Sequence, residues 1–257
     1  MSPTYAPHLG STYAPPTPRP SAPHAAVHTL DALLDEAHAR LAEGDAARAL
    51  DRLVPGLRRA YDALPPEAWR DAAERRCLTH PLAALLHQDP FVWRAFAKPH
   101  GYPGDAGVLD LIYGTVPPPD DTTPLGLALY AHTRHAPACA SVRWRRDLLA
   151  GLIDEAGAAA PGRARVLSVA CGHLREAQRA AAVRDGALAA FYALDQDPCS
   201  VARVREEQAA HGVTPVLGAV KDVIVGRAAF PDLTLAYAAG LYDYLPDPVA
   251  ARLTARM

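Results

Sequence analysis

Apolar residues in the first half of the chain recur at the spacing of an α-helix. Leu30, Leu33, Leu34 and Leu41 occupy positions i, i+3, i+4 and i+11, which lie on one face of a helix. After an N-cap at Asp45 a second helix is predicted, and similar patterns separated by proline residues predict six more. These cover about 66–77, 81–88, 90–97, 105–113, 124–134 and 138–156. We therefore expect residues 27–156 to form an all-helical region.

The pattern changes after Pro161, where short apolar runs begin to alternate with helical segments. Strands that alternate with helices indicate βαβ units, in which helices cover both faces of a parallel sheet. Residues 161–257 are therefore predicted to form an α/β domain that binds a nucleotide-like ligand. Its four expected strands are RVLSVA, AFYALD, TPVLGAV and DLTLAYAAG, and its helices are expected at 173–185, at 198–211 and from about Pro246.

Composition adds limits to this picture. Residues 1–26 are rich in proline, serine and threonine without apolar periodicity, so we expect a disordered tail. The chain has 257 residues and a formal net charge of -2, which gives no global attraction to nucleic acid or to an anionic membrane. Its four cysteines form no C-x-x-C pair, and no apolar run is long enough to span a membrane. We expect a cytoplasmic protein without a structural metal site.

The turn after the first strand holds the most informative residues. In open α/β sheets the ligand lies outside the carboxyl ends of the strands. The first strand is followed by Ala170 and by Gly172, the one glycine of the turn, whereas a dinucleotide needs several. Asp195 follows the second strand, where a carboxylate can accept both ribose hydroxyls. Asp222 follows the third, where it can accept an adenine amino group. This combination fits an adenosine without a pyrophosphate, and S-adenosyl-L-methionine is the best match.

Three stretches carry a resemblance to a known family: KPHGYPGD (98–105), LSVACGHLRE (167–176) and AGLYDYLPD (239–247). The region from about residue 90 resembles class I S-adenosylmethionine-dependent methyltransferases. More narrowly, it is similar to bacterial enzymes assigned to the biosynthesis of hydroxy fatty acid methyl esters. The resemblance implies a Rossmann-like sheet and a helical cap over the substrate, with Tyr102 and Asp105 facing the site. It also implies cofactor contacts at Gly172, Glu176, Asp195, Gln196 and Asp222.

The chain departs from that family in two places. The turn carries His173 and Leu174, where relatives tend to have a proline and a small residue, and this bulk is expected to narrow the methionine end of the pocket. A full class I domain has seven strands, whereas this sequence stops one short helix after the fourth. We expect an incomplete sheet that belongs to a longer protein, or one whose fourth strand is covered by a homodimer or another partner.

Several candidates also have a purely structural interpretation. Asp105 would serve as the N-cap of a helix, and Glu176 would lie in a first helical turn, where a carboxylate favours the helix dipole. Tyr242 and Asp243 follow the fourth strand, beside the expected position of the transferred methyl group. They would face the substrate, or form part of a tyrosine pair with a solvated aspartate. His132, His135 and His173 are candidate bases. Alternatively, each is a histidine at the surface or at a helix cap.

The sequence thus predicts a methyltransferase that acts on a small molecule, with carboxyl O-methylation as the favoured reaction. A carboxylate acceptor is already ionised and needs no general base, and Lys98 or Arg143 would pair with it. One alternative is a cyclase or an aminocarboxypropyl transferase that uses the same cofactor. Another is a non-catalytic protein that binds the cofactor or a partner. The absence of a basic face and of an Asn/Asp-Pro-Pro-Tyr motif argues against nucleic acid as the acceptor.

Overall fold

The structure is a computed structural model that describes residues 23–257, with side chains from residue 29 onward. The chain divides into two compact units, residues 1–85 and 86–257, and each is described by itself. The predicted tail lies outside the described residues except for 23–26, which already belong to the first helix. The division between the units falls inside the helical region expected at 27–156.

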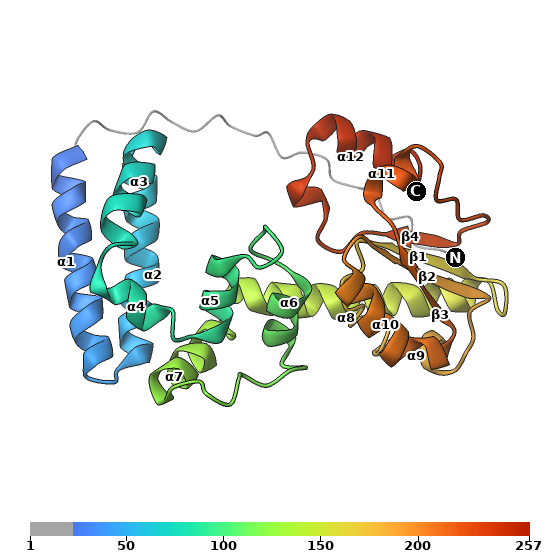
Figure 1. Ribbon diagram of the computed structural model, residues 1–257, viewed down its shortest axis with the longest axis horizontal. Coiled ribbons are helices and arrows are strands. Elements are labelled where there is room, and N and C mark those ends of the chain that lie inside the picture. Colours follow the sequence, from blue (N-terminus) through green and yellow to red (C-terminus); the bar gives the residue numbers. More distant parts are fainter. Residues whose placement is uncertain (1–22) are drawn as a thin grey trace, which may run out of the picture. The chain divides into compact units, whose positions relative to one another are not determined.

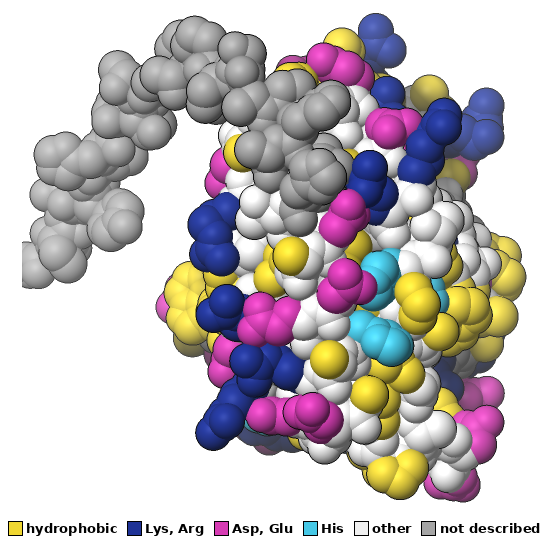
Figure 2. Space-filling model, turned by 90° about the vertical axis from the view of Figure 1, so that its left-hand side faces the viewer, with side chains coloured by type: hydrophobic (Ala, Val, Ile, Leu, Met, Phe, Trp, Pro, Cys, Tyr) yellow, Lys and Arg dark blue, Asp and Glu magenta, His cyan; other side chains and the backbone are white. Residues whose placement is uncertain are grey.

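The first unit consists of helices (Figure 1). Leu30 and Leu34 of the first helix pack with Leu50 and Leu53 of the second, and the side chain of Asp45 accepts the backbone N–H of Arg48 as the predicted N-cap. The unit's surface mixes both signs of charge, as the face shown in Figure 2 illustrates. Its elements are α1 (Pro23–Ala42), α2 (Ala46–Ala63), α3 (Pro66–Ala72), a π-helical turn η1 (Ala73–Cys77) and the start of α4 (Pro81–Leu86).

Four helices open the second unit. Three of them begin at side-chain N-caps, because Asp89, Asp105 and Thr123 each accept a backbone N–H of the following turn. The long fourth helix leads directly to the sheet. The helices are α5 (Pro90–Ala97), α6 (Ala106–Tyr113), α7 (Pro124–Thr133) and α8 (Pro137–Ala159), close to the predicted ranges.

A four-stranded parallel sheet follows, which confirms the predicted α/β class. Its strands lie in the order β3-β2-β1-β4, so that β1 pairs with β2 on one side and with β4 on the other. No strand among the described residues pairs with the outer side of β4, and a partner at that edge stays a prediction. The strands are β1 (Arg165–Val169), β2 (Ala190–Asp195), β3 (Val213–Leu217) and β4 (Leu235–Tyr237).

Both faces of the sheet are covered. Successive side chains of a strand point to opposite faces, so β1 places Val166 in one core, with α8 and α9, and Leu167 in the other, with α11 and α12. No helix in the part of the chain that the structure describes is both long and apolar enough to cross a membrane. The remaining elements are α9 (Ala181–Arg184), α10 (Pro198–Gln208), η2 (Ala209–His211), α11 (Val220–Ile224), η3 (Tyr242–Tyr244) and α12 (Asp247–Thr254).

The predicted helix at 173–185 is wrong over most of its length. Residues 170–180 form successive turns, and only α9 is helical. Leu174, inside the predicted helix, has a φ angle of 51°, in the left-handed region that a right-handed helix cannot contain, and Ala170 and Gly172 just before it have the same conformation. Glu176 therefore does not lie in the first turn of a helix, and a favourable helix dipole does not explain its position.

Candidate functional site

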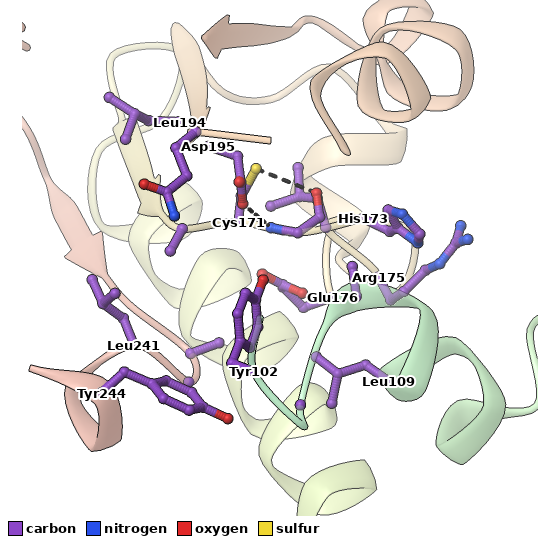
Figure 3. A pocket seen from close by; sticks show the side chains of 18 of the residues that line it. Tyr102, Leu109, Cys171, His173, Arg175, Glu176, Leu194, Asp195, Leu241 and Tyr244 are labelled. Atoms are coloured by element: carbon purple, nitrogen blue, oxygen red, sulfur yellow. Dashed lines mark hydrogen bonds between the residues drawn. The ribbon is translucent and has the colours of Figure 1, made fainter. Parts of the chain in front are cut away.

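A cavity of about 240 Å³ lies at the carboxyl ends of the strands. Figure 3 shows the side chains that face it. One wall comes from the sheet and includes the turn after β1, the end of β2, and the segments after β3 and β4. The other wall comes from α6 and the loop before it, including Tyr102, Leu109 and Tyr113. The cavity is therefore formed entirely within the second unit.

Asp195 anchors the sheet side of the cavity. It is the last residue of β2 and is only 8 % exposed. Its Oδ2 accepts the backbone N–H of Gly172 at 2.7 Å, and its Oδ1 accepts that of Asp197 at 2.9 Å. These two bonds fix the carboxylate and tie the ends of β1 and β2 together. Each carboxylate oxygen has two lone pairs, so both can still accept a hydroxyl group.

Gly172 lies where the turn approaches α6. Its φ angle is 54°, and a Cβ atom at this position would lie 3.2 Å from the Cβ of Ala106. A side chain at residue 172 would thus be strained in its backbone and crowded against the helix. Ala170, Gly172 and Glu176 all line the cavity, as do Asp195 and Gln196, so the structure brings five of the six predicted cofactor residues together.

Glu176 is a second buried carboxyl group of the cavity wall. It is 5 % exposed, and its Oε1 accepts the Tyr237 hydroxyl at 2.7 Å. Burial raises the pKa of Glu176, although hydrogen bonds from its own backbone and from Tyr237 partly oppose the rise. Burial also raises the pKa of Tyr237 well above its ordinary value. Glu176 thus lines the cavity with its carboxyl group held by Tyr237, which is not itself a lining residue.

The raised pKa of Glu176 predicts a pH-dependent stability. A carboxyl group whose pKa is raised by folding stabilises the native state fully below its unfolded pKa, near 4.5, and this contribution is lost as the pH rises through the folded pKa. Glu176→Gln retains an oxygen that accepts the Tyr237 hydroxyl but does not ionise. We expect the variant to gain stability relative to the wild type as the pH rises from acidic to neutral. Urea unfolding midpoints of both proteins across that range measure the difference, and a constant difference would contradict the expectation.

Two tyrosines face each other across the cavity mouth. Tyr102 lies in the loop between α5 and α6, Tyr244 ends η3, and their ring centroids are 5.3 Å apart. Figure 3 shows both side chains directed toward the cavity. Tyr102 thus lines the cavity, and its substrate-facing role stays a prediction, whereas Tyr244 was not among the predicted site residues.

The predicted roles of Tyr242 and Asp243 are wrong, since neither lines the cavity. The Tyr242 hydroxyl lies 2.8 Å from Oγ1 of Thr254, at the surface beside α12, and Asp243 is exposed. Residues of a 3₁₀ turn project about 120° apart. Tyr242 and Tyr244 consequently point in different directions from η3, and the second of them reaches the cavity.

Asp105 and Asp222 both have structural roles. Asp105 is 2 % exposed, caps α6 through the N–H of Val108, and binds Arg94 through both carboxylate oxygens. Asp222 accepts the backbone N–H of Ala219 and pairs with Arg227. The N-cap interpretation of Asp105 is confirmed, and its substrate-facing role stays a prediction. Neither residue lines this cavity, so the predicted adenine contact of Asp222 is wrong. Gly218 and Val220 occupy the corresponding part of the wall.

A charged cluster beside the cavity was missed by the sequence analysis. Asp110 of α6 is 2 % exposed and binds Arg175 through two hydrogen bonds of 2.6 and 2.7 Å. Nδ1 of His173 lies 2.8 Å from the same carboxylate, and Arg175 also pairs with Glu207. Burial by itself would raise the pKa of Asp110, but the bonds from Arg175 and His173 outweigh it and hold that pKa well below its usual range.

The remaining candidates lie outside the cavity wall. Arg143 donates to the backbone carbonyls of Ile112 and Arg134, and Lys98 is an exposed residue that ends α5 in a left-handed conformation. His132 and His135 do not line the cavity either. No group of three or more His, Cys, Asp or Glu side chains suited to a metal ion occurs within residues 29–257.

Comparison with known protein families, with curated proteins and with solved structures finds no match to the chain.

Proposed function

We propose that the cavity binds S-adenosyl-L-methionine and that the protein is a methyltransferase for a small-molecule acceptor. The observation that carries this proposal is Asp195, a buried carboxylate at the end of β2 that lines the cavity. Two backbone N–H groups bind this carboxylate, and the turn beside it has a single glycine. The strand order β3-β2-β1-β4 supports it, because nucleotide-binding sheets have the same order around their first strand.

The cavity residues match the parts of this cofactor. Asp195 would accept hydrogen bonds from the two ribose hydroxyls. The apolar side chains of Leu194 and Val220 would pack against the adenine ring. Glu176 would accept the amino group of the methionine portion. When bound, the cofactor supplies a methyl group on a positively charged sulfur. Tyr102 and Tyr244 would exclude water from the mouth, so that catalysis depends mainly on positioning the acceptor.

Carboxyl O-methylation is the acceptor chemistry that the sequence resemblance favours, and it remains a proposal. A carboxylate acceptor would need an approach to the cavity between Tyr102 and the segment after β4. A non-catalytic, partner-dependent protein is a second candidate. The observation that favours it is the outer side of β4, which no strand among the described residues covers.

Isothermal titration tests the proposal directly. We expect S-adenosyl-L-methionine to bind with micromolar affinity, which corresponds to about -8 kcal/mol, and NAD to bind far more weakly because the turn has a single glycine. Mass spectrometry of reactions with an acceptor library then distinguishes a methylated product from cofactor cyclisation or aminocarboxypropyl transfer. A folded sample that binds neither compound would contradict the proposal, and binding without turnover would favour the partner-dependent alternative.

A further inference from the structure

A second cavity of about 530 Å³ adjoins the first within the same unit. Its volume lies in the range of small-molecule sites. Its walls are mainly apolar and come from α5, α6 and the proline-rich loop after α6, including Trp93, Leu111, Val116 and Pro117. It shares Asp110 and His173 with the first cavity. This arrangement places an apolar chamber next to the proposed cofactor site.

A third, polar cavity of about 160 Å³ shares lining residues with both of the others. It has Arg94, Gly107 and Arg203 in common with the second cavity, and Tyr102 and Ala106 in common with the first. Among the described residues, His173 is the one that lines all three. His173 therefore belongs both to the wall of the apolar chamber and to the wall of the cofactor cavity.

The hydrogen bonds of His173 leave one ring nitrogen available. Asp110 is ionised because Arg175 binds it, so Nδ1 of His173 must carry the proton that it donates to Oδ2 of Asp110 at 2.8 Å. In the neutral ring Nε2 is then an acceptor. No hydrogen bond to Nε2 is present among the residues that the structure describes, although the side chain is only 15 % exposed. A half-enclosed acceptor of this kind is suited to a ligand that donates a hydrogen bond.

We propose that the second cavity holds the methyl acceptor, that this acceptor is an apolar molecule with a hydroxyl group, and that Nε2 of His173 is the base that takes the hydroxyl proton. This inference rests on the proposed function. It replaces the carboxylate acceptor by an alcohol or a phenol, because a carboxylate has no proton to donate to Nε2.

The reaction is balanced with these groups alone. The acceptor oxygen forms a bond to the methyl carbon, and the bond between that carbon and sulfur breaks, leaving its electron pair on a neutral sulfide. The hydroxyl proton moves to Nε2 of His173, which becomes an imidazolium ion stabilised by Asp110. The products are a methyl ether, S-adenosylhomocysteine and a proton, which the ring later returns to water.

Charges of both signs surround the His173 ring. Asp110 lies on α6 and Arg175 on the turn after β1. The wall of the third cavity adds five more charged or titratable residues. They are Arg94 of α5, His100 shortly after α5, Asp105 at the N-cap of α6, Asp197 at the N-cap of α10, and Arg203 of α10. Arg94 is paired with Asp105, and Arg203 with Glu207. Asp110 is thus the carboxylate in direct contact with the ring.

The experiment compares naphthol with naphthoic acid, which share one apolar body and differ in the hydroxyl or carboxyl group. His173→Asn retains a side-chain N–H for Asp110 but has no base at the Nε2 position. We expect the wild type to methylate naphthol and the variant to lose about 100-fold or more of kcat/KM, the usual contribution of a general base. Affinity for S-adenosyl-L-methionine, measured by titration, should fall by far less than kcat/KM does. His135→Asn, at an exposed histidine outside all three cavities, is the matched control and should behave as the wild type.

A binding measurement tests the location separately. Val116→Phe should fill part of the second cavity and abolish naphthol binding in titration, while Val54→Phe, at a valine that is 60 % exposed in the first unit, should not. The inference is overturned if naphthol fails to bind at millimolar concentration, if naphthoic acid alone is methylated, or if His173→Asn leaves naphthol methylation intact. In each of these cases cofactor binding still upholds the proposed function. If the cofactor itself does not bind, the proposed function fails, and the titration reports that result independently.

Discussion

Replacement of Asp110 with alanine is expected to lower the free energy of unfolding by about 3 kcal/mol. The carboxylate is buried and accepts two hydrogen bonds from Arg175, whose guanidinium is itself only 6 % exposed. Removal of Asp110 leaves the buried guanidinium of Arg175 without two of its hydrogen bonds. This loss lowers the free energy of unfolding far more than the loss of a surface ion pair does. Glu207 still pairs with Arg175 in the variant, and for this reason we expect the lower end of the range.

Asp147→Ala provides the matched control. Asp147 also pairs with two arginines, Arg146 and Arg179, but its side chain is 46 % exposed. An exposed pair contributes about 1 kcal/mol at most. Urea unfolding of the full chain, followed by circular dichroism, compares the two variants with the wild type. Equal losses in both would show that burial of the Asp110 cluster has no special effect on stability.

The same cluster predicts how stability responds to acid. Because the pKa of Asp110 is lowered by folding, its stabilising contribution is present above the usual aspartate pKa and is lost as the pH falls through the folded value. The wild type should therefore lose more stability on acidification than Asp110→Ala does. This sign is opposite to that expected for Glu176, whose pKa is raised by burial. Measurements on Asp110→Ala and Glu176→Gln together distinguish the contributions of the two carboxyl groups to the pH dependence of stability.

The sequence predicted most of the fold because its patterns are local. The short apolar run that includes Val166 and Leu167 marks a strand that is buried on both faces, and Asp45 marks a helix start through its own side chain. The helix expected at 173–185 could not be rejected in this way. Leu174 interrupts it with a left-handed backbone conformation, and no sequence rule places a left-handed leucine there.

The predicted site failed where strand ends were uncertain. The third strand was expected to include residues up to Val220 but ends at Leu217, so Asp222 lies within α11 instead of at the strand end. Asp110 was missed because its partners lie about 65 residues away in the chain. One signal was available: Asp110 is the sole charged residue of α6, AGVLDLIY, which is otherwise apolar. A single charged residue in an otherwise apolar helix indicates that its side chain is buried and paired with an opposite charge.

The decisive test of the cofactor site is Asp195→Ala, which is expected to weaken the binding of S-adenosyl-L-methionine by roughly 100-fold. Two hydrogen bonds from ribose hydroxyls to a carboxylate contribute about 3 kcal/mol together, and each 1.4 kcal/mol is a factor of ten in affinity. Asp195→Asn retains one acceptor oxygen and should lose less. Titration calorimetry measures both constants, and circular dichroism with thermal unfolding verifies that the variants fold.

Asp222→Ala is the control that the structure supplies for this test. The sequence pattern alone places Asp222 after the third expected strand as it places Asp195 after the second, and it assigns both to the adenosine. In the structure Asp195 lines the cavity, whereas Asp222 lies outside it and bonds to Ala219 and Arg227. We therefore expect the alanine variant at 222 to bind the cofactor within a few-fold of the wild type. Equal losses at 195 and 222 would restore the adenine contact inferred from the sequence and would require β3 and α11 to rearrange on binding.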